Sequence, residues 1–329
     1  MTFAERVQHV TTLGFLERHA RFLVTVLLHA GVCVGRQYCA FAGIRRGQVM
    51  HDFFTNLVGR GFATAYPRAH GSTHLYHLHA KALYQAIGEP NSRYRRPTPL
   101  PCAVERLIVL DAVLASPDLT WLATEREKVS HFTRKTRLPP RELPHLIFGT
   151  PPKTTVRYFP DKLPIGLDTG GWTPTFLYLV TRRLPIDFRA FLHRHAELLR
   201  ALPTWTIRLL VPRHLAGTVP RYQAALRDEL ATPLQRTTLD ELQWYFAQRQ
   251  KGVSTPGVIA DARFQRAQEA FASPRFRVLY RTWLQVGDAA LHATLSQVLA
   301  EALARRSGQL ECHVLPHPYQ HLASLVGTA

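Results

Sequence analysis

The spacing of the apolar residues changes at Gly61, and this change limits what the first 90 residues can fold into. Before it, the apolar residues Met50, Phe54, Leu57 and Val58 recur at spacings that place them on one stripe of a helix. After it, the segments FATAY and THLYHLH alternate like short strands around the turn-forming segment PRAHGS. The pattern predicts a helix that leads directly into a β-hairpin.

Other helices are predicted on both sides of this pair. Residues 13–31 repeat apolar side chains at helical spacing and end at a glycine, and residues 35–44 read as a shorter helix with a turn at Gly43. A further helix follows the hairpin in AKALYQAIG. The predicted order is helix, helix, turn, helix, hairpin, helix.

The third predicted helix has a polar and basic side opposite its apolar stripe. The side chains expected there are Arg45, Arg46, Gln48, His51, Asp52 and Thr55, and the hairpin loop adds Arg68 and His70. Such groups donate to phosphates or read base edges, and the free N–H groups of a helix N-terminus also favour anions. Asp52 would repel phosphate unless it accepts from a cytosine amino group or orients a neighbouring arginine.

The charge of the chain agrees with a polyanionic partner. The sequence has 41 Lys and Arg against 23 Asp and Glu, a formal charge of +18, and the first 100 residues carry 12 basic against four acidic side chains. Nucleic acid and acidic membrane surfaces attract such an excess, because phosphate contacts release condensed counterions. A genome that favours arginine codons is the alternative source of the charge.

The element order and the local charge resemble the winged helix-turn-helix family of DNA-binding domains. The segment LVGRGF is similar to the end of a recognition helix that passes into the wing in that family. The resemblance covers residues 1–88 and implies contact with double-stranded DNA through the basic and polar side chains named above. The same fold also serves as a protein-protein module, and in that case the third helix would only pack.

Prolines indicate where the first domain ends. The segment GEPNSRYRRPTPLP holds four prolines and three arginines, cannot sustain a helix, and suits an exposed connector. We therefore predict a DNA-binding domain at residues 1–88, a linker at 89–101, and an α/β domain with a helical C-terminal region at 102–329. A second irregular segment, residues 138–155, reads as a long loop inside that domain.

The second domain alternates predicted helices and strands. Helices are expected at 103–116, 188–202 and 288–306, the last of them suited to core or dimer packing, and strands are expected at 118–129, 155–168, 176–180 and 204–212. This succession resembles the restriction-endonuclease-like core. Together with the winged helix it resembles the replication-relaxation family of plasmid and integrative-element proteins.

The nuclease resemblance implies a metal site that this sequence does not complete. In that core, a Pro-Asp pair and an acidic residue on the next strand hold a divalent metal beside the scissile phosphate. Pro160 and Asp161 match the first element, but the next strand, FLYLVTRR, contains no carboxylate. The domain is therefore interpreted as a degenerate nuclease fold, with Asp161 as its one weak catalytic candidate.

We expect no metal and no cofactor. His77 and His79 share a strand face, but no Cys or carboxylate nearby completes a zinc site, so histidines near phosphate are the favoured interpretation. The segment CHVLPHPYQH, residues 312–321, reads as a loop or tail. The motifs of nucleotide-binding loops and of common hydrolases are absent from the sequence.

These observations together predict a sequence-selective double-stranded DNA-binding protein, either a transcriptional regulator or an accessory factor of a mobile element. The most apolar early run, residues 22–35, is shorter than the roughly 20 residues of a membrane span, so no membrane contact is expected. The four cysteines form no C-x-x-C pair and the N-terminus lacks a secretory signal, which favours the cytoplasm and its nucleoid. A homodimer remains open, and a metal-dependent nuclease is the alternative; enzymatic activity is not favoured.

Overall fold

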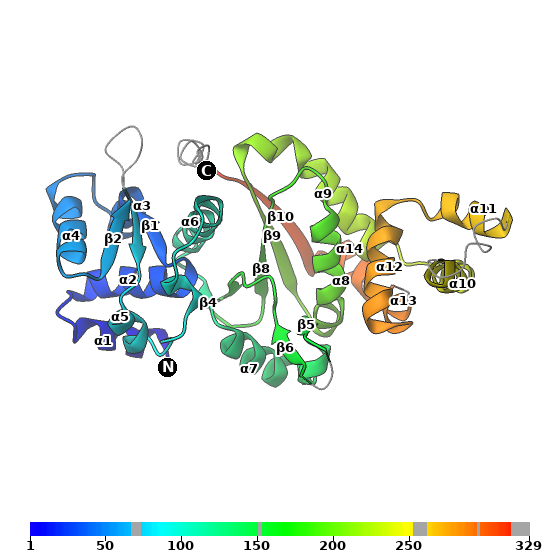
Figure 1. Cartoon of the computed structure of the whole chain (residues 1–329), viewed down its shortest axis with the longest axis horizontal. Coiled ribbons are helices and arrows are strands. Elements are labelled where there is room, and N and C mark those ends of the chain that lie inside the picture. The colour runs from blue at the N-terminus through cyan, green and yellow to red at the C-terminus, as the bar shows by residue number, and fades with distance from the viewer. Residues whose placement is uncertain (67–73, 151–152, 253–261, 295–296, 317–329) are drawn as a thin grey trace. The chain divides into compact units, whose positions relative to one another are not determined.

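The computed structural model combines helices with β-sheets (Figure 1). The residues that it describes are 1–66, 74–150, 153–252, 262–294 and 297–316. They divide into two compact units, which are treated separately below. Unit 1 comprises residues 1–124 with residues 314–316, and unit 2 comprises residues 125–313.

Unit 1 packs its helices around a small antiparallel sheet. Its helices are α1 (Phe3–Thr11), α2 (Glu17–His29), α3 (Gly35–Ala42), α4 (Gln48–Gly59), α5 (Lys81–Ala86), the short η1 (Arg93–Arg95) and α6 (Leu100–Leu114). Its strands are β1 (Val32–Val34), β2 (Ala63–Tyr66), β3 (Leu75–Leu78) and β4 (Thr120–Leu122). Strand β3 pairs antiparallel with β1 on one side and with β2 on the other.

Local sequence signals explain where the first helices begin and end. Helix α1 starts at a capping box, in which Thr2 and Glu5 each accept a hydrogen bond from the other's backbone N–H. Gly14, at φ +84°, lies between α1 and α2, so the single helix predicted at 13–31 begins only at Glu17. Helix α2 ends at His29, close to the predicted end at Gly31, and the next residues form strand β1, which was not predicted.

The proline-rich segment 89–101 is an integral part of unit 1. Tyr94 is buried, and its carbonyl oxygen accepts a hydrogen bond from Nε2 of His77 at 2.9 Å. Helix α6 follows directly and is fixed by Asp111, whose carboxylate accepts from both terminal nitrogens of Arg36 at 2.9 and 2.6 Å. The compact units divide after Thr124, whereas the sequence placed the boundary at 89–101. The segment contains the short helix η1 and the first residues of α6, and its prolines do not prevent packing.

Unit 2 is built on a mixed sheet. Its strands are β5 (His145–Phe148), β6 (Thr155–Tyr158), β7 (Ile165–Leu167), β8 (Pro174–Leu179), β9 (Trp205–Val211) and β10 (Gly308–Val314). Strands β10, β9, β8 and β7 lie side by side in that order. Strands β8 and β9 are parallel and β7 is antiparallel to β8, while β5 and β6 form a separate two-stranded ribbon.

Helices surround this sheet and extend from it. They are α7 (Glu125–Thr136), η2 (Pro140–Glu142), α8 (Ile186–Ala201), η3 (Arg213–Thr218), α9 (Val219–Leu226), the π-helical η4 (Arg227–Ala231), α10 (Arg236–Gly252), α11 (Ala262–Ala270), α12 (Pro274–Val286), α13 (Ala289–Ala293) and α14 (Val298–Ala304). Helix α8 connects the parallel strands β8 and β9. Helices α10 to α13 enclose a second apolar core around Phe246 and Leu279.

Several predicted elements of the second domain were wrong. Residues 125–136 form helix α7 instead of the end of a strand, because acidic side chains in its first turn and basic ones in its last turn suit the helix dipole. The loop expected at 138–155 contains most of the β5–β6 ribbon. The helix expected at 288–306 is divided into α13 and α14.

None of the helices within the described ranges combines the length and the apolar character that crossing a bilayer requires.

Candidate nucleic-acid interface and a charged cleft

Helix α4 presents one polar side to solvent. Gln48, His51 and Thr55 are exposed on the helix, and Arg45 and Arg46 are exposed in the turn just before it. No side chain caps the N-terminus of α4, where Gly47 occupies the N-cap position. Free N–H groups and two arginines therefore meet at the same end of the helix, and this combination suits an anion.

The opposite side of α4 is held by aromatic packing. Phe53 stacks on Tyr38 with ring centroids 4.4 Å apart, and Phe54 stacks on Tyr76 at 3.9 Å. Leu57 is fully buried beside them. The contacts with α3 and with β3 fix the rotation of α4 about its own axis, so its polar side is presented in one orientation.

Arg60 fixes the end of α4. Its guanidinium lies 4.8 Å from the ring centroid of Phe15 and 4.7 Å from that of Phe62, and it donates a hydrogen bond to the carbonyl oxygen of Leu13. Cation–π contacts with two aromatic rings that also contact each other give Arg60 a packing role. This residue belongs to the segment LVGRGF that prompted the winged-helix resemblance.

The structure refines the sequence prediction for α4 in three ways. Val58, assigned to the apolar stripe, is 37% exposed, whereas Phe53 is only 5% exposed and was not predicted to be buried. Asn56 is exposed and was missed, although helical spacing from Asp52 would have found it. Gln48 donates a hydrogen bond to Asp52 at 2.6 Å, so this carboxylate is held by a neighbour on the same side of α4.

Two predicted DNA contacts cannot be placed. Arg68 and His70 lie outside the described residues.

His77 in strand β3 and His79 just after it have structural roles. His77 is buried and donates to the carbonyl oxygen of Tyr94, and burial lowers the pKa of His77 although this hydrogen bond opposes the shift. His79 is hydrogen-bonded to Thr64, with Nε2 and Oγ1 2.9 Å apart. The interpretation of His77 as a histidine near phosphate was therefore wrong, because its ring points into the core.

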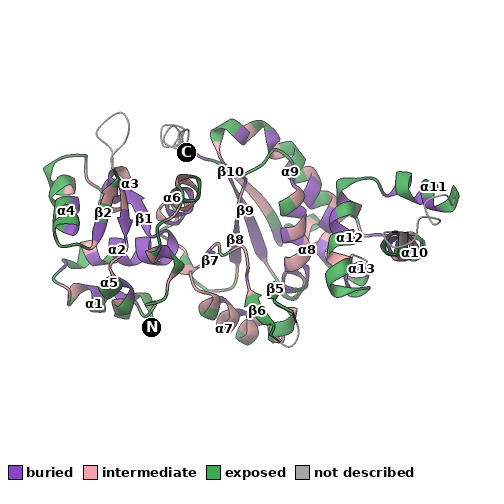
Figure 2. Ribbon diagram, in the orientation of Figure 1, coloured by how far each residue is buried: buried purple, intermediate pink, exposed green. Residues whose placement is uncertain are grey.

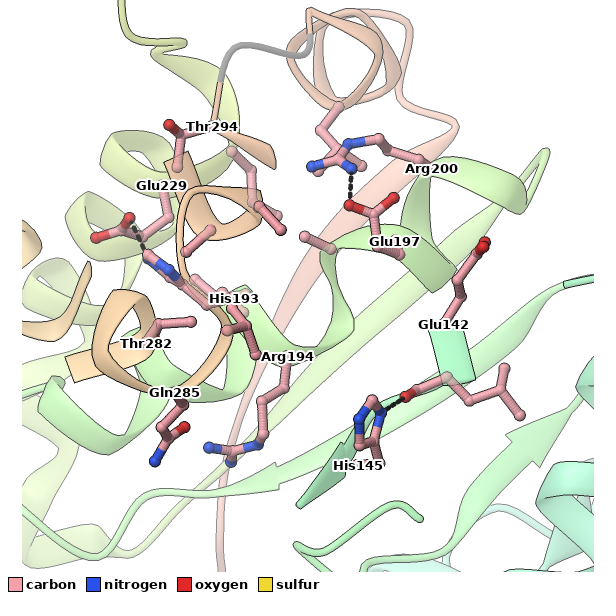
Figure 3. A pocket seen from close by; sticks show the side chains of 18 of the residues that line it. Glu142, His145, His193, Arg194, Glu197, Arg200, Glu229, Thr282, Gln285 and Thr294 are labelled. Atoms are coloured by element: carbon pink, nitrogen blue, oxygen red, sulfur yellow. Dashed lines mark hydrogen bonds and ion pairs between the residues drawn. The ribbon is translucent and has the colours of Figure 1, made fainter. Parts of the chain in front are cut away.

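Unit 2 contains a cleft of about 310 Å³ along one side of helix α8. Its walls come from α8, from η2 and β5, from η4, and from helices α12 to α14. Figure 3 shows His193 directed at Glu229 on one side and Arg200 directed at Glu197 on the other. These two pairs join charged groups of the walls, and leucine and alanine side chains also line the cleft.

The strongest charge network of the cleft centres on Glu229. Its side chain is only 1% exposed and accepts hydrogen bonds from Arg189 and from Nε2 of His193, the latter at 2.7 Å. Arg275 lies within 3.6 Å of the same carboxylate, and Arg189 also pairs with Asp228 at 2.7 Å. The network ties η4 to α8 and α12, so we assign it a structural role.

Asp161 does not stand at the start of a strand. It lies in the turn between β6 and β7, and its Oδ1 accepts a hydrogen bond from Arg194 on α8 at 2.7 Å. The neighbouring His195 is 3% exposed, and burial lowers its pKa to about 4, so that the ring is neutral at pH 7. An arginine thus already neutralises the carboxylate that a nuclease would use for its metal.

Two further carboxylates of unit 2 are also engaged. Glu125 accepts a hydrogen bond from the backbone N–H of Tyr158 at 2.9 Å, and Asp168 accepts one from that of Trp172 at 2.7 Å. Within the described ranges, no group of three or more His, Cys, Asp or Glu side chains is arranged to hold a metal ion.

Comparisons with protein-family models, with curated proteins and with solved structures find no match.

Proposed function

We propose that this protein binds double-stranded DNA through the exposed side of α4 and the turn before it, and that it acts as a transcriptional regulator or as an accessory factor of a mobile element. The observation that carries the proposal is the position of Arg45 and Arg46. They are exposed at the uncapped N-terminus of a helix whose other side is fixed by buried aromatic rings.

The arrangement of unit 1 supports this proposal. The order α2, β1, α3, α4, β2, β3 and the sheet order β1-β3-β2 agree with a winged helix-turn-helix, in which the last helix before the hairpin enters the major groove. Gln48, Thr55 and Asn56 add amide and hydroxyl groups that read base edges. Phosphate contacts by the arginines would position the helix, and these polar groups would supply selectivity.

The nuclease alternative has weaker support. It requires a second carboxylate beside Asp161, whereas β8 carries none and Arg194 occupies the one that is present. A plasmid-nicking assay tests for nuclease activity. The protein incubated with plasmid and Mg²⁺ or Mn²⁺ should leave the plasmid intact. Metal-dependent nicking that Asp161→Ala abolishes would establish the alternative.

The affinity for DNA should depend strongly on salt. Each phosphate that a Lys or Arg neutralises contributes a slope of roughly −0.9 to the plot of log K against log salt concentration, so several contacts should give about −4 or steeper. Fluorescence anisotropy with a labelled duplex of mixed sequence, titrated at a series of NaCl concentrations, measures this slope. Tight binding with a slope near zero would remove the electrostatic basis of the proposal.

A further inference from the structure

The β5–β6 ribbon of unit 2 exposes apolar side chains on both of its faces. Ile147 and Val156 are directly opposite each other in the register and are 62% and 41% exposed. Phe148 is 51% exposed and belongs to the next pair, so it points to the other face. Figure 2 shows most of the ribbon in the colour of exposed residues. The end of the ribbon is thus an apolar wedge.

The other end of the ribbon is firmly attached to unit 2. Leu143 and Phe159, which flank the two strands, are buried, and the N–H of Phe159 donates to the carbonyl oxygen of Pro144 at 2.6 Å. The N–H of Tyr158 donates to Glu125 on helix α7. The wedge is therefore carried on an anchored base.

A glycine shapes the outer end. Gly149 follows β5 at φ +90°, and a Cβ at this position would lie 2.2 Å from the carbonyl oxygen of Lys153. No other residue fits so close to the returning strand without a shift of the backbone. The glycine therefore allows the backbone of Lys153 to come close to the end of β5.

The sequence of the ribbon and of the segment before it is basic. Residues 133–158 contain one carboxylate, Glu142, against six cationic side chains: Arg134, Lys135, Arg137, Arg141, Lys153 and Arg157. Within the ribbon, Lys153 and Arg157 are exposed, and Arg157 has an ion pair with Glu125 at 3.9 Å between two exposed groups. An exposed pair of this kind contributes little, so Arg157 can exchange it for a phosphate.

We propose that the outer end of the β5–β6 ribbon binds duplex DNA, with Ile147, Phe148 and Val156 against the base pairs of the minor groove and with Lys153 and Arg157 on the flanking phosphates. A protein partner with a flat surface would cover the apolar side chains on only one face of the ribbon. A DNA groove encloses the ribbon and contacts the apolar side chains on both of its faces. Apolar wedges flanked by cations are a recurrent way to enter the minor groove and bend the duplex. This contact is separate from that of α4 and does not rest on it.

Photo-crosslinking on the full chain tests the proposal. Phe148→p-benzoylphenylalanine keeps an aromatic side chain at the exposed position, and Leu284→p-benzoylphenylalanine is the matched control, because Leu284 is 49% exposed on α12 of the same unit. Both proteins are irradiated with a labelled AT-rich duplex at low salt. We expect a covalent DNA adduct from position 148 and at most a trace from position 284.

The outcomes separate this proposal from the one for α4. DNA binding without an adduct at position 148, or a crosslink from 148 to a second protein chain, overturns the ribbon contact and leaves α4 unaffected. An adduct that persists in an Arg45→Ala/Arg46→Ala background supports a ribbon contact that is separate from that of α4. Lys153→Gln/Arg157→Gln should lower the affinity at low salt roughly tenfold. An unchanged affinity would contradict the assignment of these cations to phosphates.

Discussion

Phe54→Ala should lower the free energy of unfolding of unit 1 by about 3–5 kcal/mol. The ring is 1% exposed, stacks on Tyr76 and meets Tyr38 and Phe53 edge-on with centroids 5.9 and 5.0 Å away. Removal of the ring leaves a cavity between α4 and β3, since the surrounding aromatic side chains are too constrained to fill it.

Hydrogen exchange measured by mass spectrometry resolves this effect, because peptides from unit 1 and unit 2 are read separately. Protection of α2 and β3 should fall in Phe54→Ala while that of β8 and β9 stays unchanged. Val49→Ala is the control on the same helix, since Val49 is 54% exposed and its truncation should cost less than about 0.5 kcal/mol. Equal protection in the two variants would show that α4 is not packed as described.

Glu229→Ala should destabilise unit 2 by about 3–5 kcal/mol. The substitution removes the carboxylate that Arg189 and Arg275 share, and both guanidinium groups remain buried with an uncompensated share of positive charge. Asp228 still pairs with Arg189, but its side chain is 49% exposed and cannot replace the buried contact. The loss should therefore approach that of a broken buried ion pair.

The same carboxylate predicts a pH dependence. Burial alone would raise the pKa of Glu229, but the hydrogen bond and charge of His193, with the hydrogen bond from Arg189, hold it below the usual 4.5. A carboxyl group whose pKa is lower in the folded than in the unfolded protein stabilises the fold fully at pH values above its unfolded pKa. This stabilisation is lost as the pH falls from the unfolded pKa through the folded one. The parent should thus lose stability on acidification below pH 4.5, and Glu229→Ala should lose less over the same interval.

Urea denaturation followed by tryptophan fluorescence measures both effects, because Trp205 is buried in strand β9 of unit 2. Glu197→Ala is the control, since Glu197 is 49% exposed in its pair with Arg200 and should contribute under about 1 kcal/mol. If Glu229→Ala were no more destabilising than Glu197→Ala, the ion pairs of Glu229 would not stabilise the packing of η4 against α8 and α12.

Helical period and turn residues were enough to predict α4, the hairpin after it and the parallel strands around α8. These elements have clear apolar patterns, and Gly43 and Gly61, at φ +64° and +70°, occupy the turns where they were expected. The same signals failed where the packing partners are distant in sequence. Strand β1 is only three residues long and exists because β3 pairs with it.

For the candidate sites too, local spacing was enough to predict some features, whereas contacts between residues distant in sequence were not predicted. The exposed side of α4 followed from spacing, because burial of Phe54 and Leu57 places Gln48 and Thr55 on the other side. The partners of charged side chains did not follow, because the pairing of Asp161 with Arg194 and of Glu229 with Arg275 joins separate elements through the fold. Asp161 was considered as a catalyst because it matches the Pro-Asp element of the nuclease core, and its pairing with Arg194 was not predicted.

The most direct test of the proposed function compares two double variants of the full chain for binding to a duplex selected from a random pool. Arg45→Ala/Arg46→Ala removes the arginines before α4, and Arg213→Ala/Arg221→Ala removes two exposed arginines of unit 2 as the charge-matched control. At physiological salt, the first should weaken binding at least roughly 30-fold, at about 1 kcal/mol or more for each arginine, and the second should change it little. Equal affinities of the Arg45/Arg46 variant and the parent would contradict the account, because the helix would then only pack.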